Sequence, residues 1–178
     1  MQVHTLAAMM LVSLVGFGAK PSRLGFSATS LGDPPRITRV RSPDAAIAAV
    51  IRDAPAWSST LRSLLATIDA SDGLVFIEDG PCGHSVHACL ALSVKIAGPS
   101  RLLRIRVDAR RSYCQLSLDI GHELQHAIEI LANPGVRDWH TAYSLFQRIG
   151  RTGSERFETQ AALQVGDQIE DECRARDR

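Results

Sequence analysis

Apolar residues recur along this chain with two different periods, and each change of period marks a change of predicted structure. In Asp44–Asp53, and again from Ser58 or Ser59 to Gly73, they return every three or four residues, as on a helix with one buried side. Pro55 lies between these segments and ends the first helix. The pattern therefore predicts two helices before the first strand.

A strand-like period follows in three segments, Leu74–Glu78, His87–Ala97 and Leu102–Asp108. The connections contain the turn sequences Asp79-Gly80-Pro81 and Gly98-Pro99-Ser100. Because both turns are short, the strands are predicted to pair in chain order as an antiparallel sheet.

The helical period returns in Ser112–Leu131, where the sequence Asn133-Pro134-Gly135 follows and ends the helix. Two further helices are predicted over Asp138–Ile149 and Gly153–Cys173. Helices, then strands, then helices is the order of an α+β fold, here with a small three-stranded antiparallel sheet packed on helices.

The N-terminal residues have a different composition. Leu6–Gly18 is uncharged and nearly all apolar, which fits the hydrophobic part of a secretory signal and is too short for an ordinary transmembrane helix. Little positive charge precedes it, so an uncleaved anchor or a disordered tail are the alternatives. We predict a signal peptide in 1–18, a linker in 19–43 and one domain in 44–175. The mature protein is expected to be secreted or periplasmic, without stable membrane insertion.

Charge excludes one class of partner. The 178 residues carry a formal net charge of +1, which does not indicate binding to nucleic acid. Five arginines do cluster, but Asp108 interrupts them, and their spacing favours the solvent-exposed face of a strand. They are Arg101, Arg104, Arg106, Arg110 and Arg111.

The segment His122-Glu123-Leu124-Gln125-His126 lies within the predicted helix Ser112–Leu131 and carries the clearest chemistry. Residues four apart share one helix face, so His122 and His126 can bind one zinc ion. Glu123 lies about 100° around the helix and is placed to activate a zinc-bound water as a general base. The alternative is a pair of core histidines with ordinary hydrogen-bond partners.

The stretch from Ile120 to Ala127 resembles the active-site helix of zincin metallopeptidases, and the layout is similar to short bacterial zincin-like proteins. The resemblance implies a small sheet behind that helix, with an edge strand that receives peptide. After His126 the chain lacks the His-x-x-Gly-x-x-His continuation of metzincins. A glutamate on a later helix, as in gluzincins, is then the implied third ligand. The gluzincin Glu-x-x-x-Asp pattern is not met, because Ala162 lies four residues after Glu158.

Two glutamates are candidates for that ligand, and we predict Glu158. Thr152-Gly-Ser-Glu155 has the spacing of a capping box, which gives Glu155 a structural role at a helix start. On a helical wheel Glu158 falls within an apolar arc, where a carboxylate needs a metal or a charged partner. The alternative partner is a buried arginine, Arg148 or Arg151.

Four other residues are secondary candidates. Asp119 can orient a ligand histidine or form an ion pair with an arginine. Glu129 lies too far along the helix to share an ion with His122 and is interpreted as a supporting or cleft residue. Tyr143 and His140 can donate to a developing oxyanion, with packing or surface exposure as the alternative.

The four cysteines are informative about the cellular compartment in which the protein functions. Export permits disulfides, and we predict a bond between Cys82 and Cys89. Free thiols, or a second metal site that includes the nearby histidines, are the alternatives. The pairing of Cys114 and Cys173 is left open.

Together these features predict a zinc-dependent hydrolase, specifically a metallopeptidase that acts on peptide or protein substrates. The competing hypothesis is a binding or structural protein that has the zincin fold without turnover.

Overall fold

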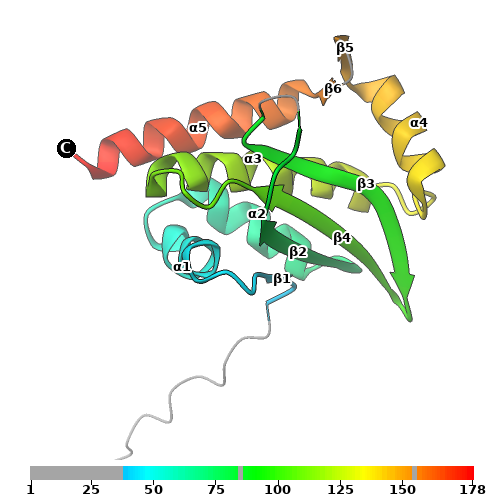
Figure 1. Ribbon diagram of the computed structural model, residues 1–178, viewed down its shortest axis with the longest axis horizontal. Helices are drawn as coiled ribbons and strands as arrows, with labels where there is room; N and C mark the ends of the chain where they lie inside the picture. Colours follow the sequence, from blue (N-terminus) through cyan, green and yellow to red (C-terminus); the bar gives the residue numbers. More distant parts are fainter. Residues whose placement is uncertain (1–37, 84–85, 154–155) are drawn as a thin grey trace, which may run out of the picture. The chain divides into compact units, whose positions relative to one another are not determined.

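The computed structural model describes residues 38–83, 86–153 and 156–178 (Figure 1). The predicted signal peptide of residues 1–18 and residues 19–37 of the predicted linker lie outside these ranges. The end of that linker contains the short strand β1 (Val40–Arg41) and so belongs to the folded domain. Within the described ranges no helix has both the length and the apolar character needed to span a membrane.

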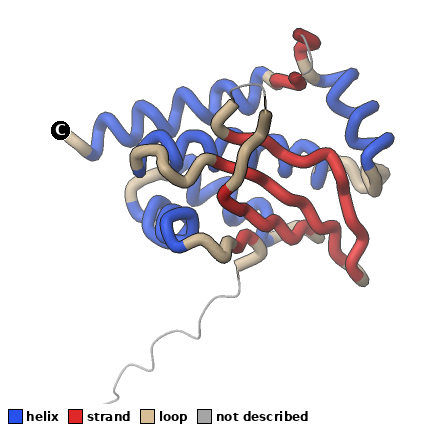
Figure 2. The backbone as a smooth tube through the Cα atoms, in the orientation of Figure 1, coloured by secondary structure: helices blue, strands red, loops and turns tan. Residues whose placement is uncertain are grey.

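The protein is a mixed α/β domain in which a four-stranded sheet packs on helices (Figure 2). After β1 the described elements are α1 (Ala45–Asp53), η1 (Ala54–Ala56), α2 (Ser59–Asp69), β2 (Gly73–Asp79), β3 (Ala88–Ala97), β4 (Ser100–Val107), α3 (Tyr113–Leu131), α4 (Trp139–Ile149), β5 (Arg151–Gly153), β6 (Arg156–Glu158) and α5 (Gln160–Arg176).

The strands of the main sheet lie in the order β1-β2-β4-β3. β1 is parallel to β2, and β2 is parallel to β4, with Leu74 opposite Leu102. Only β3 runs antiparallel to its neighbour, with Leu90 of β3 opposite Ile105 of β4. The predicted antiparallel pairing of His87–Ala97 with Leu102–Asp108 is therefore confirmed, whereas the predicted pairing of Leu74–Glu78 is wrong in both neighbour and direction.

The connections explain the difference. Gly98 has a φ of 58° and allows the tight turn that joins β3 and β4 as a hairpin. The connection between β2 and β3 is longer, and its described residues are 80–83 and 86–87. At its end the amide of Asp108, which follows β4, donates to the carbonyl of His87 at 2.8 Å. This longer connection leaves room for β4 between β2 and β3.

The two faces of the sheet differ in burial. One face lies against α2 and α3 and forms the hydrophobic core (Figure 1). Its largest fully buried side chains include Ile77, Leu103, Ile105, Ile120 and Leu124. The other face exposes Phe76, Arg104 and Arg106. Both arginines pair with Glu78, which agrees with the prediction of a charged, solvent-exposed face.

Arg101 does not follow that prediction, because its side chain is buried at the C-terminal end of α3. Its guanidinium donates to the carbonyl of Ile130 at 3.0 Å and to that of Leu131 at 2.7 Å. It also forms a two-pronged ion pair with Asp72. The last carbonyls of a helix lack partners within the helix, and here the side chain of Arg101 on β4 donates hydrogen bonds to them.

The C-terminal region also departs from the sequence prediction. Residues predicted as the start of a long helix instead form the hairpin β5–β6, and α5 begins only at Gln160, with Thr159 as its N-cap. Glu155 lies outside the described ranges, and so does Ser154 of its predicted capping box. α5 then runs alongside α3, and Gly121 permits the close approach, since a Cβ there would lie 2.1 Å from Cδ1 of Ile169.

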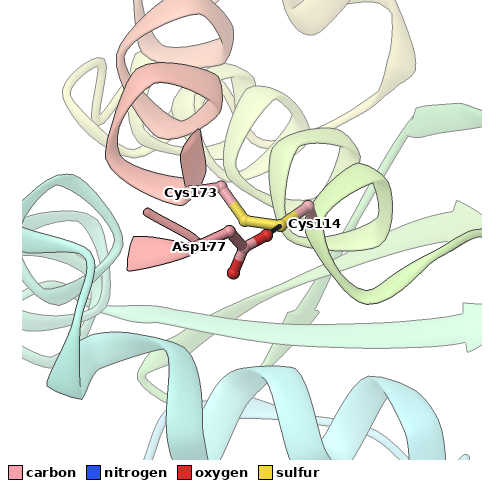
Figure 3. A group of neighbouring side chains, drawn as sticks. All are labelled: Cys114, Cys173 and Asp177. Carbon is pink, nitrogen blue, oxygen red and sulfur yellow. Dashed lines mark hydrogen bonds between the residues drawn. A yellow bond between two sulfur atoms is a disulfide. The ribbon is translucent and has the colours of Figure 1, made fainter. Parts of the chain in front are cut away.

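Two disulfides join elements of this framework. The predicted bond between Cys82 and Cys89 is confirmed and ties the residues that follow β2 to the start of β3. Cys114 bonds with Cys173 and joins the first turn of α3 to the end of α5, beside the carboxylate of Asp177 (Figure 3). Disulfides form and persist in oxidising compartments, so the protein is suited to a non-reducing environment.

Candidate metal centre

The middle of α3 presents two histidines toward the same point. The rings of His122 and His126 have centroids 4.9 Å apart and are nearly perpendicular. The side chain of His126 is 6% exposed and that of His122 is 16% exposed. The helical spacing thus produces the predicted pair, in a largely buried setting.

Glu158 completes a group of three possible ligands. Its Oε2 lies 3.1 Å from Nε2 of His122 and 4.0 Å from Nε2 of His126. The side chain as a whole is 41% exposed, but Oε2 itself is buried. The predicted residue is therefore in the site, although the helical-wheel argument for it is wrong. Glu158 ends β6, and the β5–β6 hairpin brings it to α3.

The donor set suits zinc. Two imidazole nitrogens and one carboxylate oxygen are common zinc ligands at about 2.0–2.2 Å, which separates ligands of a tetrahedral ion by about 3.3 Å. In this protein the candidate atoms of His122, His126 and Glu158 all lie within 4.8 Å of one another. Small side-chain movements would let them share one ion and leave a fourth position for water or substrate.

Glu123, predicted as the general base, is not among the three candidate ligands. Its side chain is buried and lines a cavity beside the histidines. Burial raises the pKa of Glu123, while the nearby histidines and a backbone hydrogen bond from Leu90 act in the opposite direction. A raised pKa makes the carboxylate of Glu123 a stronger base toward a nearby proton donor.

The electrostatic state of His122 depends on its carboxylate neighbours. Burial alone would lower its pKa, but the hydrogen bond with Glu158 and the charge of Glu123 outweigh this effect. The pKa of His122 is consequently raised above its ordinary value. Without a metal, a proton on His122 is held by Glu158, and a metal must displace that proton.

His126 forms a hydrogen bond with a residue that the sequence suggested only as a supporting or cleft residue. Oε2 of Glu129 lies 2.9 Å from Nδ1 of His126, which is the position of a supporting residue and not of a cleft residue. The hydroxyl of Thr159 donates to the other oxygen of Glu129 at 2.5 Å. Thr159 was not predicted from the sequence, although a threonine before a helical segment is an N-cap signal.

Asp119 takes the alternative role that the sequence left open. Its Oδ2 accepts from Nε of Arg111 at 3.0 Å. Burial raises the pKa of Asp119, and the charge of Arg111 acts against this. Asp119 is thus an ion-pair partner that also contributes negative charge near His122.

A cavity of about 330 Å³ adjoins Glu123, His126 and Glu158. Strand β3 supplies one wall and α4 with β6 the other, and most of the lining is apolar. The lining includes Leu90, Leu92, Trp139, Tyr143, Phe146 and Phe157. A ligand that enters it would place an apolar group beside the candidate metal ligands.

The two predicted oxyanion donors have different positions. Tyr143 lines the cavity and stacks on Trp139, with ring centroids 5.0 Å apart. His140 is exposed and packs edge-on against Trp139. Tyr143 is therefore available to a bound ligand, whereas His140 shows the packing and exposure that were the alternative.

The chain was compared with protein-family models, curated proteins and solved structures, and none of the three comparisons found a match.

Proposed function

We propose that this protein is a zinc-dependent hydrolase, most specifically a metallopeptidase of the zincin type. The observation that carries the proposal is the convergence of His122, His126 and Glu158 on one point, with the buried carboxyl group of Glu123 beside it. Each residue type suits its assigned role, and a cavity gives a substrate access to the group.

Zinc would supply a Lewis acid that acidifies water and polarises a carbonyl group. His122, His126 and Glu158 would hold it. Glu123 would take a proton from the attacking water on its carboxylate and deliver that proton to the departing amine. Its burial favours this exchange, because a carboxylate with a raised pKa is a stronger base toward the attacking water.

A peptide is the substrate class best supported by the surroundings. β3 is an edge strand of the main sheet and forms one wall of the cavity. An extended peptide could add to such an edge through backbone hydrogen bonds and insert one side chain into a pocket. Because the pocket is lined mainly by apolar and aromatic groups, an apolar side chain would fit best.

The proposed setting is outside the cytoplasm, secreted or periplasmic. The two disulfides support an oxidising compartment. The apolar run in residues 6–18 supports export by a signal peptide.

Hydrolysis of a mixed peptide library by the zinc-loaded protein tests the proposal. Wild type should cleave library peptides, and Glu123→Gln should bind zinc equally while turnover falls at least about 100-fold. Glu170→Gln, an exposed carboxylate on α5, is the matched control and should retain activity. A zinc-loaded wild type that cleaves no peptide would contradict the enzyme and favour a binding role.

A further inference from the structure

Thr159 makes two directed contacts at the junction between β6 and α5. Its side chain is buried at 4% exposure. The hydroxyl accepts a hydrogen bond from the amide of Ala162 at 3.1 Å and donates to Oε1 of Glu129 at 2.5 Å. The first contact caps α5, and the second connects α5 to α3.

Glu129 connects Thr159 to His126 through hydrogen bonds. Its Oε1 accepts from Thr159, and its Oε2 is 2.9 Å from Nδ1 of His126. An ionised carboxylate only accepts hydrogen bonds, so this geometry places the proton of a neutral His126 on Nδ1. The lone pair is then on Nε2, the atom that lies 4.0 Å from Glu158.

Thr159 also follows Glu158 directly in the chain. One hydroxyl contact therefore fixes the end of β6, where Glu158 is located, and the carboxylate that orients His126. The side chains of Thr159, Glu129 and His126 are all largely shielded from solvent, with Glu129 at 11% and His126 at 6% exposure. Water competes poorly for such hydrogen bonds.

We propose that Thr159 is a positioning residue that sets metal affinity through two ligands. It orients His126 through Glu129, and it fixes the position of Glu158 through the backbone. The inference rests on the proposed zinc function. Partners of metal-binding histidines typically change metal affinity by about 10–100-fold when they are removed.

Four variants separate this role from helix capping. Thr159→Val removes both the cap and the donor, whereas Thr159→Ser keeps both. Glu129→Met breaks the connection and leaves the cap of α5 intact. Asp44→Ala removes the N-cap of α1, where Asp44 accepts from the amides of Ala46 and Ile47, and serves as the control for cap loss.

The first measurement is zinc affinity by competition with a chelator. Thr159→Val and Glu129→Met should bind zinc about 10–100-fold more weakly than wild type. Thr159→Ser and Asp44→Ala should remain within about twofold of wild type. Wild-type affinity in Thr159→Val or Glu129→Met, or an equal loss in Asp44→Ala, would overturn the proposal.

The second measurement uses metal-free protein, so it does not depend on the proposed function. Long-range proton–nitrogen NMR spectra report which nitrogen of His126 carries the proton. Wild type and Thr159→Ser should show the Nδ1–H form, and Glu129→Met should lose that preference. A wild type with its proton on Nε2 would overturn the orienting role even if the protein binds zinc. A wild type that shows the Nδ1–H form but binds no zinc would contradict the proposed function, and with it the effect of Thr159 on metal affinity, while the orientation of His126 by Glu129 would stand.

Discussion

Nε2 of His122 and Oε2 of Glu158 lie 3.1 Å apart, although one residue is in the middle of α3 and the other ends a strand of the C-terminal hairpin. The pair brings together an imidazole and a carboxylate that attract each other in the absence of metal. It also places both atoms where one ion could bind them. Proton binding and metal binding at His122 are therefore expected to compete.

Zinc affinity should weaken as the medium becomes acidic. The pKa of His122 is raised above its ordinary value of 6.5, so protonation begins to compete with zinc above pH 6.5. Affinity should be greatest above the pKa of His122 and fall about tenfold for each further pH unit below that pKa, because one bound proton is displaced. Chelator competition between pH 8 and 5.5 measures this, and a flat profile would contradict the account.

Arg101→Met should destabilise the fold by about 3 kcal/mol. The variant removes charge-assisted hydrogen bonds to the last carbonyls of α3 and leaves those groups buried. Arg104→Met is the matched control, since Arg104 lies on the exposed face of the same strand and should cost less than about 0.5 kcal/mol. Urea unfolding measures both. Equal effects would mean that Arg101 does not support α3.

The two disulfides should differ in their contribution to stability. Cys114 and Cys173 are 59 residues apart in sequence, and closing a loop of that length stabilises by about 4 kcal/mol in the chain-entropy estimate. Cys82 and Cys89 are only 7 apart, for which the same estimate gives about 2 kcal/mol. Unfolding of the two double-serine variants tests the order, and a larger loss on removal of the Cys82–Cys89 bond would contradict it.

The local structure around the motif was readable because periodicity and capping act within a few residues. The predicted helix Ser112–Leu131 differs from α3 by one residue at its start, and Ser112 is its N-cap. The predicted helix Asp138–Ile149 likewise matches α4, with Asp138 as the cap. These signals need no knowledge of the rest of the fold.

Strand order was not readable, because a turn sequence does not say which strand comes next to it. Asp79-Gly80-Pro81 begins a long connection, whereas Gly98-Pro99 is a tight hairpin. The two have similar composition. Alternation of apolar residues is also the same for parallel and antiparallel pairing, so it cannot distinguish the two directions in a short strand.

Glu158 was chosen by an argument from a helix that the structure does not contain, yet it lies beside the two histidines. The acidic residue stood out because it lies among apolar positions in the sequence. In the structure only Oε2 of the carboxylate is buried, and a buried charged oxygen needs a partner on a strand as on a helix. The contact between Thr159 and Glu129 had no such signal. It joins α5 to α3, and hydrogen bonds between elements depend on how those elements pack.

The central claim is that His122, His126 and Glu158 hold one zinc ion, and metal analysis of purified protein tests it most directly. Wild type should contain one zinc per chain after dialysis, measured by inductively coupled plasma mass spectrometry. His126→Ala and Glu158→Ala should lose it, whereas Glu155→Ala and Glu170→Ala should retain it. Absence of zinc from wild type after zinc loading, or full zinc content in Glu158→Ala, would contradict the account.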